Sequence, residues 1–233
     1  MDKRLLVLLL LGTFLMSGHE RTNPKGLILH ESIYYHEMNL RSDWPLKQMI
    51  YVPVEKADSA DVNQMVQTID KIPARVLRDA YNAGLRIHFF QGKLTQFPST
   101  THLENLTPRG YENTETTWDD VPGIGGGKVI YAKVGHSDKG EGHGSVNLEL
   151  HEFAHSLDNY LFTSAWHHVT QYESWKSEAS ILFPNKRYFI DYQSEFFAES
   201  FAYFYHSEDR RMKLKEHAPK MYDYLTTIDK GEW

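Results

Sequence analysis

Two histidines and a glutamate have the types and spacing needed to bind a metal ion and activate water. His151, Glu152 and His155 form the pattern HExxH. On a helix, side chains at positions i and i+4 lie on the same face, so both imidazoles could reach one ion. A catalytic zinc site has three protein ligands and keeps one position for water. Glu152 is then expected beside that water as the general base.

The segment around this pattern is predicted to be a helix that packs against a core. It carries an apolar stripe made of Leu150, Phe153, Ala154, Leu157 and Leu161. Such a stripe is typical of a helix with one buried face. Asp158, one turn beyond His155 on the same face, is a candidate to orient that histidine, and an unrelated surface carboxylate is the alternative. His143, His167 and His168 are expected to be surface or loop residues.

A third ligand is expected from the aromatic, helical stretch of residues 188–205. Glu195 and Glu199 lie at positions i and i+4 within it. Carboxylates in a buried helix are costly unless they are paired or bound to a metal. One of the two is therefore expected to complete a site for one zinc ion, while the other orients a ligand. The alternative is a pair of solvated charges on an amphipathic helix.

Length and composition indicate one globular domain. The chain has 233 residues, of which 41% are hydrophobic and 24% charged, and it contains no cysteine. Disulfides, a thiol nucleophile and thiolate metal ligands are therefore excluded. The net charge of −6 gives no indication of a nucleic-acid partner.

The N-terminus resembles an export signal. Lys3 and Arg4 precede an apolar run that begins at Leu5. The run is too short for the ~20 residues of a transmembrane helix, so we expect a signal peptide over residues 1–18 and a secreted protein without a stable membrane span. An uncleaved anchor is the alternative. Residues 19–45 are expected to be an irregular lead-in or short helix, and residues 46–233 a single domain.

The order of the predicted elements favours an α+β fold. Strands come early and helices late, so a small N-terminal half of mixed sheet and helix should pack on a mostly helical C-terminal half that carries the HExxH helix, as in zincins. The predicted elements are a strand at 48–54, helices at 61–72 and from Pro73 to Gly84, strands at 85–90 and 128–134, and helices from Ser145 onward.

Two segments leave alternatives open. Residues 91–127 are rich in Gly, Pro, Thr and acidic residues and are either a binding loop or lid, or a surface excursion. Residues 128–132 are either an edge strand that could pair with an extended peptide or an ordinary paired strand. The glycines between Gly123 and Lys128 lack the spacing of a phosphate loop and are expected to form a turn.

These motifs resemble those of the anthrax lethal factor peptidase family, and within it the small secreted bacterial Pro-Pro endopeptidases. The resemblance covers nearly everything from about Gln48 to the C-terminus. It is carried, in the family's order, by residues 109–111 (RGY), 117–123 (TWDDVPG), Gly140 with Gly142 and His143, 147–152 (NLELHE) and 195–202 (EFFAESFA).

The resemblance implies roles for individual residues. It implies that His151, His155 and Glu195 hold the zinc ion. It also implies that Tyr188, seven residues before Glu195, stabilises the oxyanion of the tetrahedral intermediate, a task that suits a phenol because it can donate a hydrogen bond.

Two departures from the family pattern concern specificity. The Pro-cutting members have a tryptophan where this chain has Tyr111, and an acidic residue where it has Ser194. Arg109, Tyr111 and Ser194 are expected to contact the substrate. A tyrosine still offers a flat face to proline rings.

Together these observations predict a secreted zinc metalloendopeptidase. Its expected partner is an extended protein or peptide substrate, with proline-rich surface proteins as the expected class. The alternatives are a catalytically silent binding module of the same fold, and a zinc hydrolase that acts on a non-peptide substrate.

Overall fold

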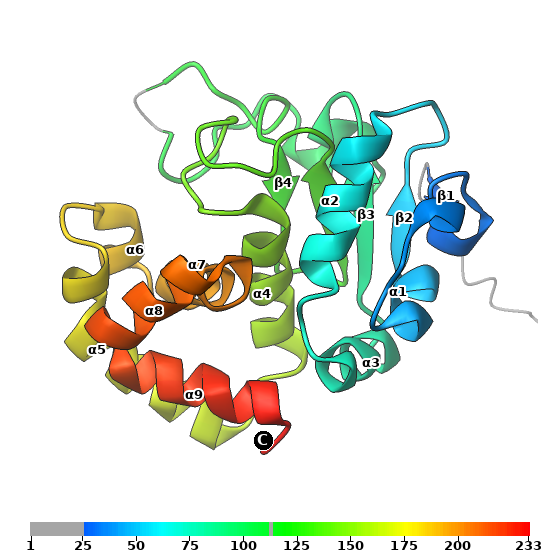
Figure 1. Ribbon diagram of the computed structural model, residues 1–233. Helices are drawn as coiled ribbons and strands as arrows, with labels where there is room; N and C mark the ends of the chain where they lie inside the picture. The colour runs from blue at the N-terminus through cyan, green and yellow to red at the C-terminus, as the bar shows by residue number, and fades with distance from the viewer. Residues whose placement is uncertain (1–25, 112–113) are drawn as a thin grey trace, which may run out of the picture.

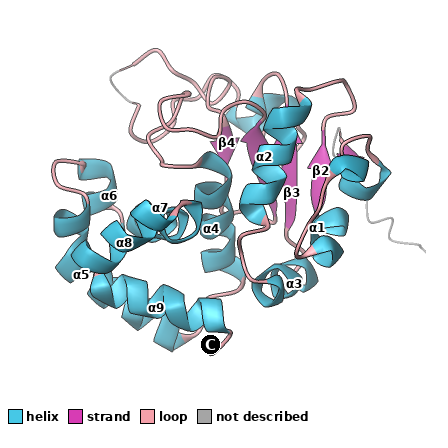
Figure 2. Ribbon diagram, in the orientation of Figure 1, coloured by secondary structure: helices cyan, strands magenta, loops and turns pink. Residues whose placement is uncertain are grey.

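The computed structural model describes residues 26–111 and 114–233. The predicted export signal at residues 1–18 lies outside the described residues. Strands are confined to one half of the molecule and most helices to the other (Figure 2), so the α+β prediction is confirmed. Within the described residues, no helix is both long and apolar enough to cross a membrane.

The sheet has five strands in the order β1-β2-β3-β5-β4. β2, β3 and β5 run parallel, and β1 and β4 are antiparallel strands at the two edges. The bounds of the strands are β1 (Leu27–Ile28), β2 (Ile50–Val52), β3 (Arg86–Phe90), β4 (Gly123–Ile124) and β5 (Val129–Lys133).

One sequence expectation about the sheet needs correction, and one open alternative is decided. The range 19–45, predicted as an irregular lead-in or a short helix, contains short helices but also contributes β1, which pairs with β2 in the register Leu27↔Val52. Of the two alternatives for residues 128–132, an edge strand or an ordinary paired strand, the structure has the second, because β5 pairs with β3 on one side and β4 on the other. The strand at that edge is β4, because Gly123 and Ile124 pair with Ala132 and Tyr131.

Short helices cover the N-terminal half, and local capping fixes where they begin and end. Asp58 precedes α2, and its side chain accepts hydrogen bonds from the backbone N–H groups of Ala60 and Asp61, which would otherwise lack partners. Gly84 follows α3 with φ of +89°, a conformation that favours glycine. The helices are η1 (Leu29–Glu31), η2 (Tyr35–Glu37), α1 (Asp43–Met49), α2 (Ser59–Ile69), α3 (Ala74–Asn82), η3 (Leu94–Gln96) and η4 (Thr101–Leu103).

The C-terminal half is helical, as predicted, but one predicted helix is interrupted. Residues 188–205 form two helices rather than one, because Tyr192 has extended backbone angles (φ −121°, ψ 115°). Tyr188 therefore lies on a separate short helix. The helices are α4 (Leu148–Tyr160), α5 (Ala165–Leu182), α6 (Arg187–Asp191), α7 (Gln193–His206), α8 (Glu208–His217) and α9 (Pro219–Lys230).

Helix α4 lies between the two halves of the molecule (Figure 1). It contacts β4, β5 and α2 on one side and packs closely on α7 on the other. Phe153, Ala154 and Leu157 of α4 and Phe196 and Phe197 of α7 are fully buried, so their apolar surface anchors both helices in one core. The functional side chains of the two helices are thus held on rigid elements.

Candidate metal centre and active-site cleft

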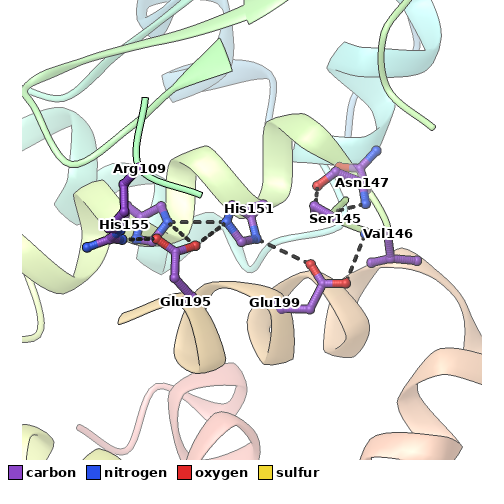
Figure 3. Close-up of polar contacts among 8 residues, drawn as sticks. All are labelled: Arg109, Ser145, Val146, Asn147, His151, His155, Glu195 and Glu199. Carbon is purple, nitrogen blue, oxygen red and sulfur yellow. Dashed lines mark hydrogen bonds and ion pairs between the residues drawn. The ribbon is translucent and has the colours of Figure 1, made fainter. Parts of the chain in front are cut away.

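The three predicted metal ligands meet between α4 and α7 (Figure 3). His151 Nε2 lies 3.2 Å from His155 Nε2 and 3.2 Å from Glu195 Oε2. His155 Nε2 lies 3.5 Å from the same oxygen. The three atoms therefore form a nearly equilateral triangle, with two corners from α4 and one from α7.

The size of this triangle fits a tetrahedral metal ion. Ligand atoms placed ~2.0–2.1 Å from zinc at tetrahedral angles lie about 3.3 Å from one another. The observed separations are 3.2 and 3.5 Å. Two imidazoles and one carboxylate are also a donor set that suits zinc. Among the described residues, His151, His155 and Glu195 are a group of side chains able to hold a metal ion.

Glu199 holds His151 from the side opposite the triangle. His151 Nδ1 lies 3.3 Å from Glu199 Oε2, and the backbone N–H of Val146 donates to Glu199 Oε1 at 3.0 Å. Glu199 is 1% exposed, so these contacts satisfy a carboxylate that would be costly to bury alone. When Nδ1 carries the proton and donates it to this carboxylate, Nε2 is free to face the site.

The electrostatics of the site favour a cation at its centre. Burial alone would lower the pKa of His151, but Glu195 and Glu199 outweigh it and raise the pKa to about 10. Burial would raise the pKa of Glu195, yet His151 and His155 lower it well below its usual range. The cluster thus retains a proton strongly, and a metal ion bound at the same nitrogen would replace that positive charge.

Glu152 faces the cleft under the edge strand. Burial is the main cause that raises the pKa of its carboxyl group, while the charges of His151 and His155 lower it. The segment after β4 is fastened to the same helix: the N–H of Gly126 donates to Ser156 Oγ at 3.0 Å, and Asn159 Nδ2 donates to Gly126 O at 2.9 Å. The glycines predicted as a simple turn therefore form a wall of the site.

Arg109 and Tyr188 border the metal triangle. Arg109 Nη2 donates to Glu195 Oε1 at 2.6 Å, using the oxygen that does not face the histidines. The guanidinium also lies over the rings of Tyr192, at 4.2 Å, and Tyr188, at 5.6 Å. Burial and the charge of Glu195 raise the pKa of Tyr188, which keeps its phenol protonated at neutral pH.

A cleft of about 880 Å³ runs over this centre. Its wall includes residues of the loop 91–127, in favour of the binding-loop alternative for that segment. Glu199 is not part of the wall and lies beneath it. The predicted site residues that line the cleft are Arg109, Tyr111, His151, Glu152, His155, Asp158, Tyr188, Ser194 and Glu195.

The residues predicted to contact substrate or to orient a ligand differ in their surroundings. Tyr111 donates from its hydroxyl to Gly142 O at 3.2 Å, which joins two loops across the cleft. Asp158 accepts a hydrogen bond from Gln171 Nε2 at 2.8 Å, and its charge interacts with His155 only through space. Asp158 is therefore held by α5, and its role in orienting His155 stays a prediction.

Reasoning from the sequence missed several residues of the cleft wall, including a histidine and two lysines. His143, expected in a loop without a role, lines the cleft and binds His136 O through Nε2 at 2.9 Å. Lys139 and Lys186 also line it. The Gly-rich stretch 135–144, which flanks the HExxH helix, was the signal that could have identified His143 and Lys139.

Comparison with protein families gives one match that covers most of the chain. Residues 37–228 match the family described as anthrax toxin lethal factor, N- and C-terminal domain. The matched range includes every residue of the metal triangle and the cleft wall described above.

Individual relatives agree with this match. A Pro-Pro endopeptidase of Clostridioides difficile (strain 630) is 37% identical over 185 residues, which cover 79% of this chain and 83% of the relative. One from Paenibacillus alvei is 32% identical over 183 residues, covering 78% and 84%. The solved structure of a Pro-Pro endopeptidase from Paenibacillus alvei superposes with a TM-score of 0.72 at 31% identity, covering 78% of this chain and 97% of that one.

Proposed function

Because the chain belongs to the anthrax toxin lethal factor family, we propose that it is a zinc endopeptidase that hydrolyses peptide bonds in extended substrates. The observation that carries this proposal is the triangle of His151 Nε2, His155 Nε2 and Glu195 Oε2, with sides of 3.2, 3.2 and 3.5 Å. It lies in the wall of an open cleft beside a half-buried carboxylate, Glu152.

The metal is proposed to be held by His151, His155 and Glu195. When bound, it would supply Lewis acidity that polarises the substrate carbonyl and makes water more acidic. Glu199 keeps His151 in the orientation that presents Nε2 to the site. Arg109 holds the other oxygen of Glu195, so that the carboxylate presents Oε2.

Glu152 is proposed to move the proton. It accepts a proton from the attacking water as the new C–O bond forms, and it gives that proton to the amine nitrogen as the C–N bond breaks. Burial is the main cause that raises the pKa of this carboxyl group. The pKa is thereby closer to neutral pH, which suits both the uptake and the release of the proton. Tyr188, protonated and half-exposed in the cleft, is proposed to donate a hydrogen bond to the oxyanion of the substrate.

The bond between two prolines is proposed as the cleaved bond. The two curated relatives above are named Pro-Pro endopeptidases. Tyr111 lines the cleft, and its ring is fixed by the hydrogen bond to Gly142 O, so it can present a flat face to a proline ring. Ser194, beside the metal ligand Glu195, lines the same cleft. Proline-rich surface proteins are the proposed natural substrates.

Export is proposed from the N-terminal segment. Lys3 and Arg4 followed by an apolar run are typical of a signal peptide. The full chain should accumulate in the culture medium of a bacterial host, with a new N-terminus near residue 18. A variant without residues 1–18 should stay in the cells. Equal distribution of both proteins would contradict export.

The function is tested by cleavage of a proline-anchored peptide library with residues 19–233, analysed by mass spectrometry. We expect cuts between prolines that disappear with a zinc chelator and return with added zinc. Glu152→Gln should keep its metal and its melting temperature but lose about 10²–10⁴-fold in kcat. Chelator-resistant cleavage, or full activity of that variant, would disprove the proposed mechanism. Cuts at other bonds would disprove the Pro-Pro specificity alone.

A further inference from the structure

Four lysine and arginine side chains line the cleft, and two of them form no ion pair with the part of the chain that the structure describes. Arg109 pairs with Glu195 at 2.6 Å, and Arg187 pairs with Asp191 at 3.0 Å. Within residues 26–111 and 114–233, no carboxylate lies within 4.0 Å of the ammonium group of Lys139 or Lys186. Both lysines line the cleft wall, so their charge is presented to whatever occupies it.

The two lysines come from different segments and line the same cleft. Lys139 belongs to the loop between β5 and α4, and Lys186 directly precedes α6. Burial, and after it the charge of Lys139, lowers the pKa of Lys186 to about 8. Two like charges held together are unfavourable, and an anion placed between them would relieve the repulsion.

Neighbouring acidic groups are engaged elsewhere. Glu141 follows Lys139 by two residues, but its carboxylate accepts a hydrogen bond from the backbone N–H of Asp138 at 2.9 Å. Glu199, which attracts Lys186 through space, is buried and bound to His151 and Val146. Neither carboxylate forms an ion pair with Lys139 or Lys186, so both ammonium groups can bind a ligand.

The two ends of the cleft differ in charge. Lys139 lies in the loop that leads into the N-terminus of α4, whereas Asp158 lies near the C-terminal end of that helix and lines the cleft as well. At 1.5 Å per residue, Asp158 is about 10 Å further along α4 than His151. One end of the cleft is thus basic and the other carries a carboxylate.

We propose that Lys139 and Lys186 form a subsite for a negatively charged side chain of the substrate, an aspartate or glutamate on one side of the cleaved bond. This inference rests on the proposed endopeptidase function and names a feature of its substrates. An acidic side chain at the basic end of the cleft is bound by both ammonium groups. At the opposite end it is repelled by the carboxylate of Asp158.

The test compares matched peptides that carry Glu or Gln at one of the three positions on either side of the cleaved bond. All peptides are blocked at both ends, so that a terminal carboxylate cannot imitate the side chain. We expect Glu to raise kcat/KM about tenfold over Gln at one position, as for a solvent-accessible charge-assisted hydrogen bond. In 1 M salt this ratio should fall towards one.

Charge-removing variants identify the lysines. Lys139→Met and Lys186→Met remove the charge and keep most of the unbranched apolar side chain. Each should lower the Glu/Gln ratio to about threefold or less, while the double variant abolishes it. Lys213→Met, at an exposed position of α8 outside the cleft, should keep the full ratio. A ratio that survives in the double variant would overturn the subsite.

Failure of the function and failure of the subsite give different results. Chelator-sensitive cleavage with a Glu/Gln ratio of one at every position overturns the subsite and leaves the endopeptidase in place. If no peptide is cleaved, the function fails, and binding of the same peptide pairs to the Glu152→Gln protein still decides the inference. Tighter binding of the Glu peptide, lost in the double lysine variant, supports it, and equal binding overturns it. A peptide with a free C-terminus that binds as well as the Glu peptide would assign the lysines to a terminal carboxylate instead.

Discussion

Glu199 and His151 are joined by a contact of 3.3 Å between Oε2 and Nδ1, while the other oxygen of Glu199 accepts the backbone N–H of Val146 at 3.0 Å. Val146 lies just before Asn147, whose side chain caps α4. One buried carboxylate therefore fixes both an imidazole that is proposed to bind the metal and the chain that leads into the HExxH helix.

Replacing Glu199 should weaken metal binding without removing a ligand. The side chain of Glu199→Gln has one oxygen that can accept a hydrogen bond instead of two. It therefore loses either the contact with His151 or the contact with Val146. We expect a loss of about 10–100-fold in zinc affinity, measured by competition with a chromogenic chelator. Glu173→Gln, at an exposed position of α5, is the control. Equal affinities of the two variants would show that Glu199 does not support the site.

Tyr188 and Tyr192 offer a matched pair for testing the oxyanion role. The two rings contact each other, both lie against Arg109, and they are 37% and 39% exposed. Tyr188→Phe should lower kcat by about 10²–10³-fold with unchanged zinc affinity, because the hydrogen bond forms in the transition state. Tyr192→Phe should change kcat far less. Equal losses in the two variants would remove Tyr188 from its proposed role.

Gly125 is predicted to tolerate no side chain. A Cβ atom at this position would overlap the backbone of Glu152, whereas one at Gly127 would meet atoms of Val129 no closer than 3.6 Å. Gly125→Ala should therefore push β4 from α4, lowering the free energy of unfolding by about 1–3 kcal/mol and reducing activity. Gly127→Ala should be nearly neutral. Thermal unfolding of both variants measures the difference, and similar melting temperatures would contradict this packing argument.

The preference for acidic substrates should depend on pH. Lys139 from the loop before α4, Glu199 from α7 and Arg210 from α8 surround Lys186, and burial with its basic neighbours lowers the pKa of Lys186 to about 8. A lowered pKa means that the charge is present below about pH 8 and lost above it, and a bound carboxylate shifts that midpoint upward. The Glu/Gln ratio of kcat/KM should fall between pH 7 and 10. A constant ratio over this range would argue against Lys186.

Much of the fold was predictable because the signals were local. Val62, Met65, Val66 and Ile69 recur at helical spacing, and α2 forms over Ser59–Ile69 with Asp58 as its cap. The strands β1 and β4 were not predicted, since each has two residues, too few for any periodicity. The break at Tyr192 was missed because the aromatic residues on both sides are compatible with a single helix.

The centre of the site was more predictable than its walls. His151 and His155 lie on one helix, so their spacing alone places both imidazoles on one face. Whether Glu195 or Glu199 would be nearer to them depends on how α7 packs on α4, and the resemblance to the family decided it. Lys139 and Lys186 are 47 positions apart in the sequence. The tertiary structure places both in one cleft, and no pattern in the sequence indicates this.

The division between helices and loops has a consequence for how such a protein can diversify. The metal triangle is built on α4 and α7, whereas Arg109, Tyr111 and Lys139 lie in connecting segments. Substitutions in those segments change what the cleft accepts at little cost to the core, since loops tolerate variation better than packed helices. New substrate preferences can therefore arise by mutation and selection while the hydrolytic centre is inherited unchanged.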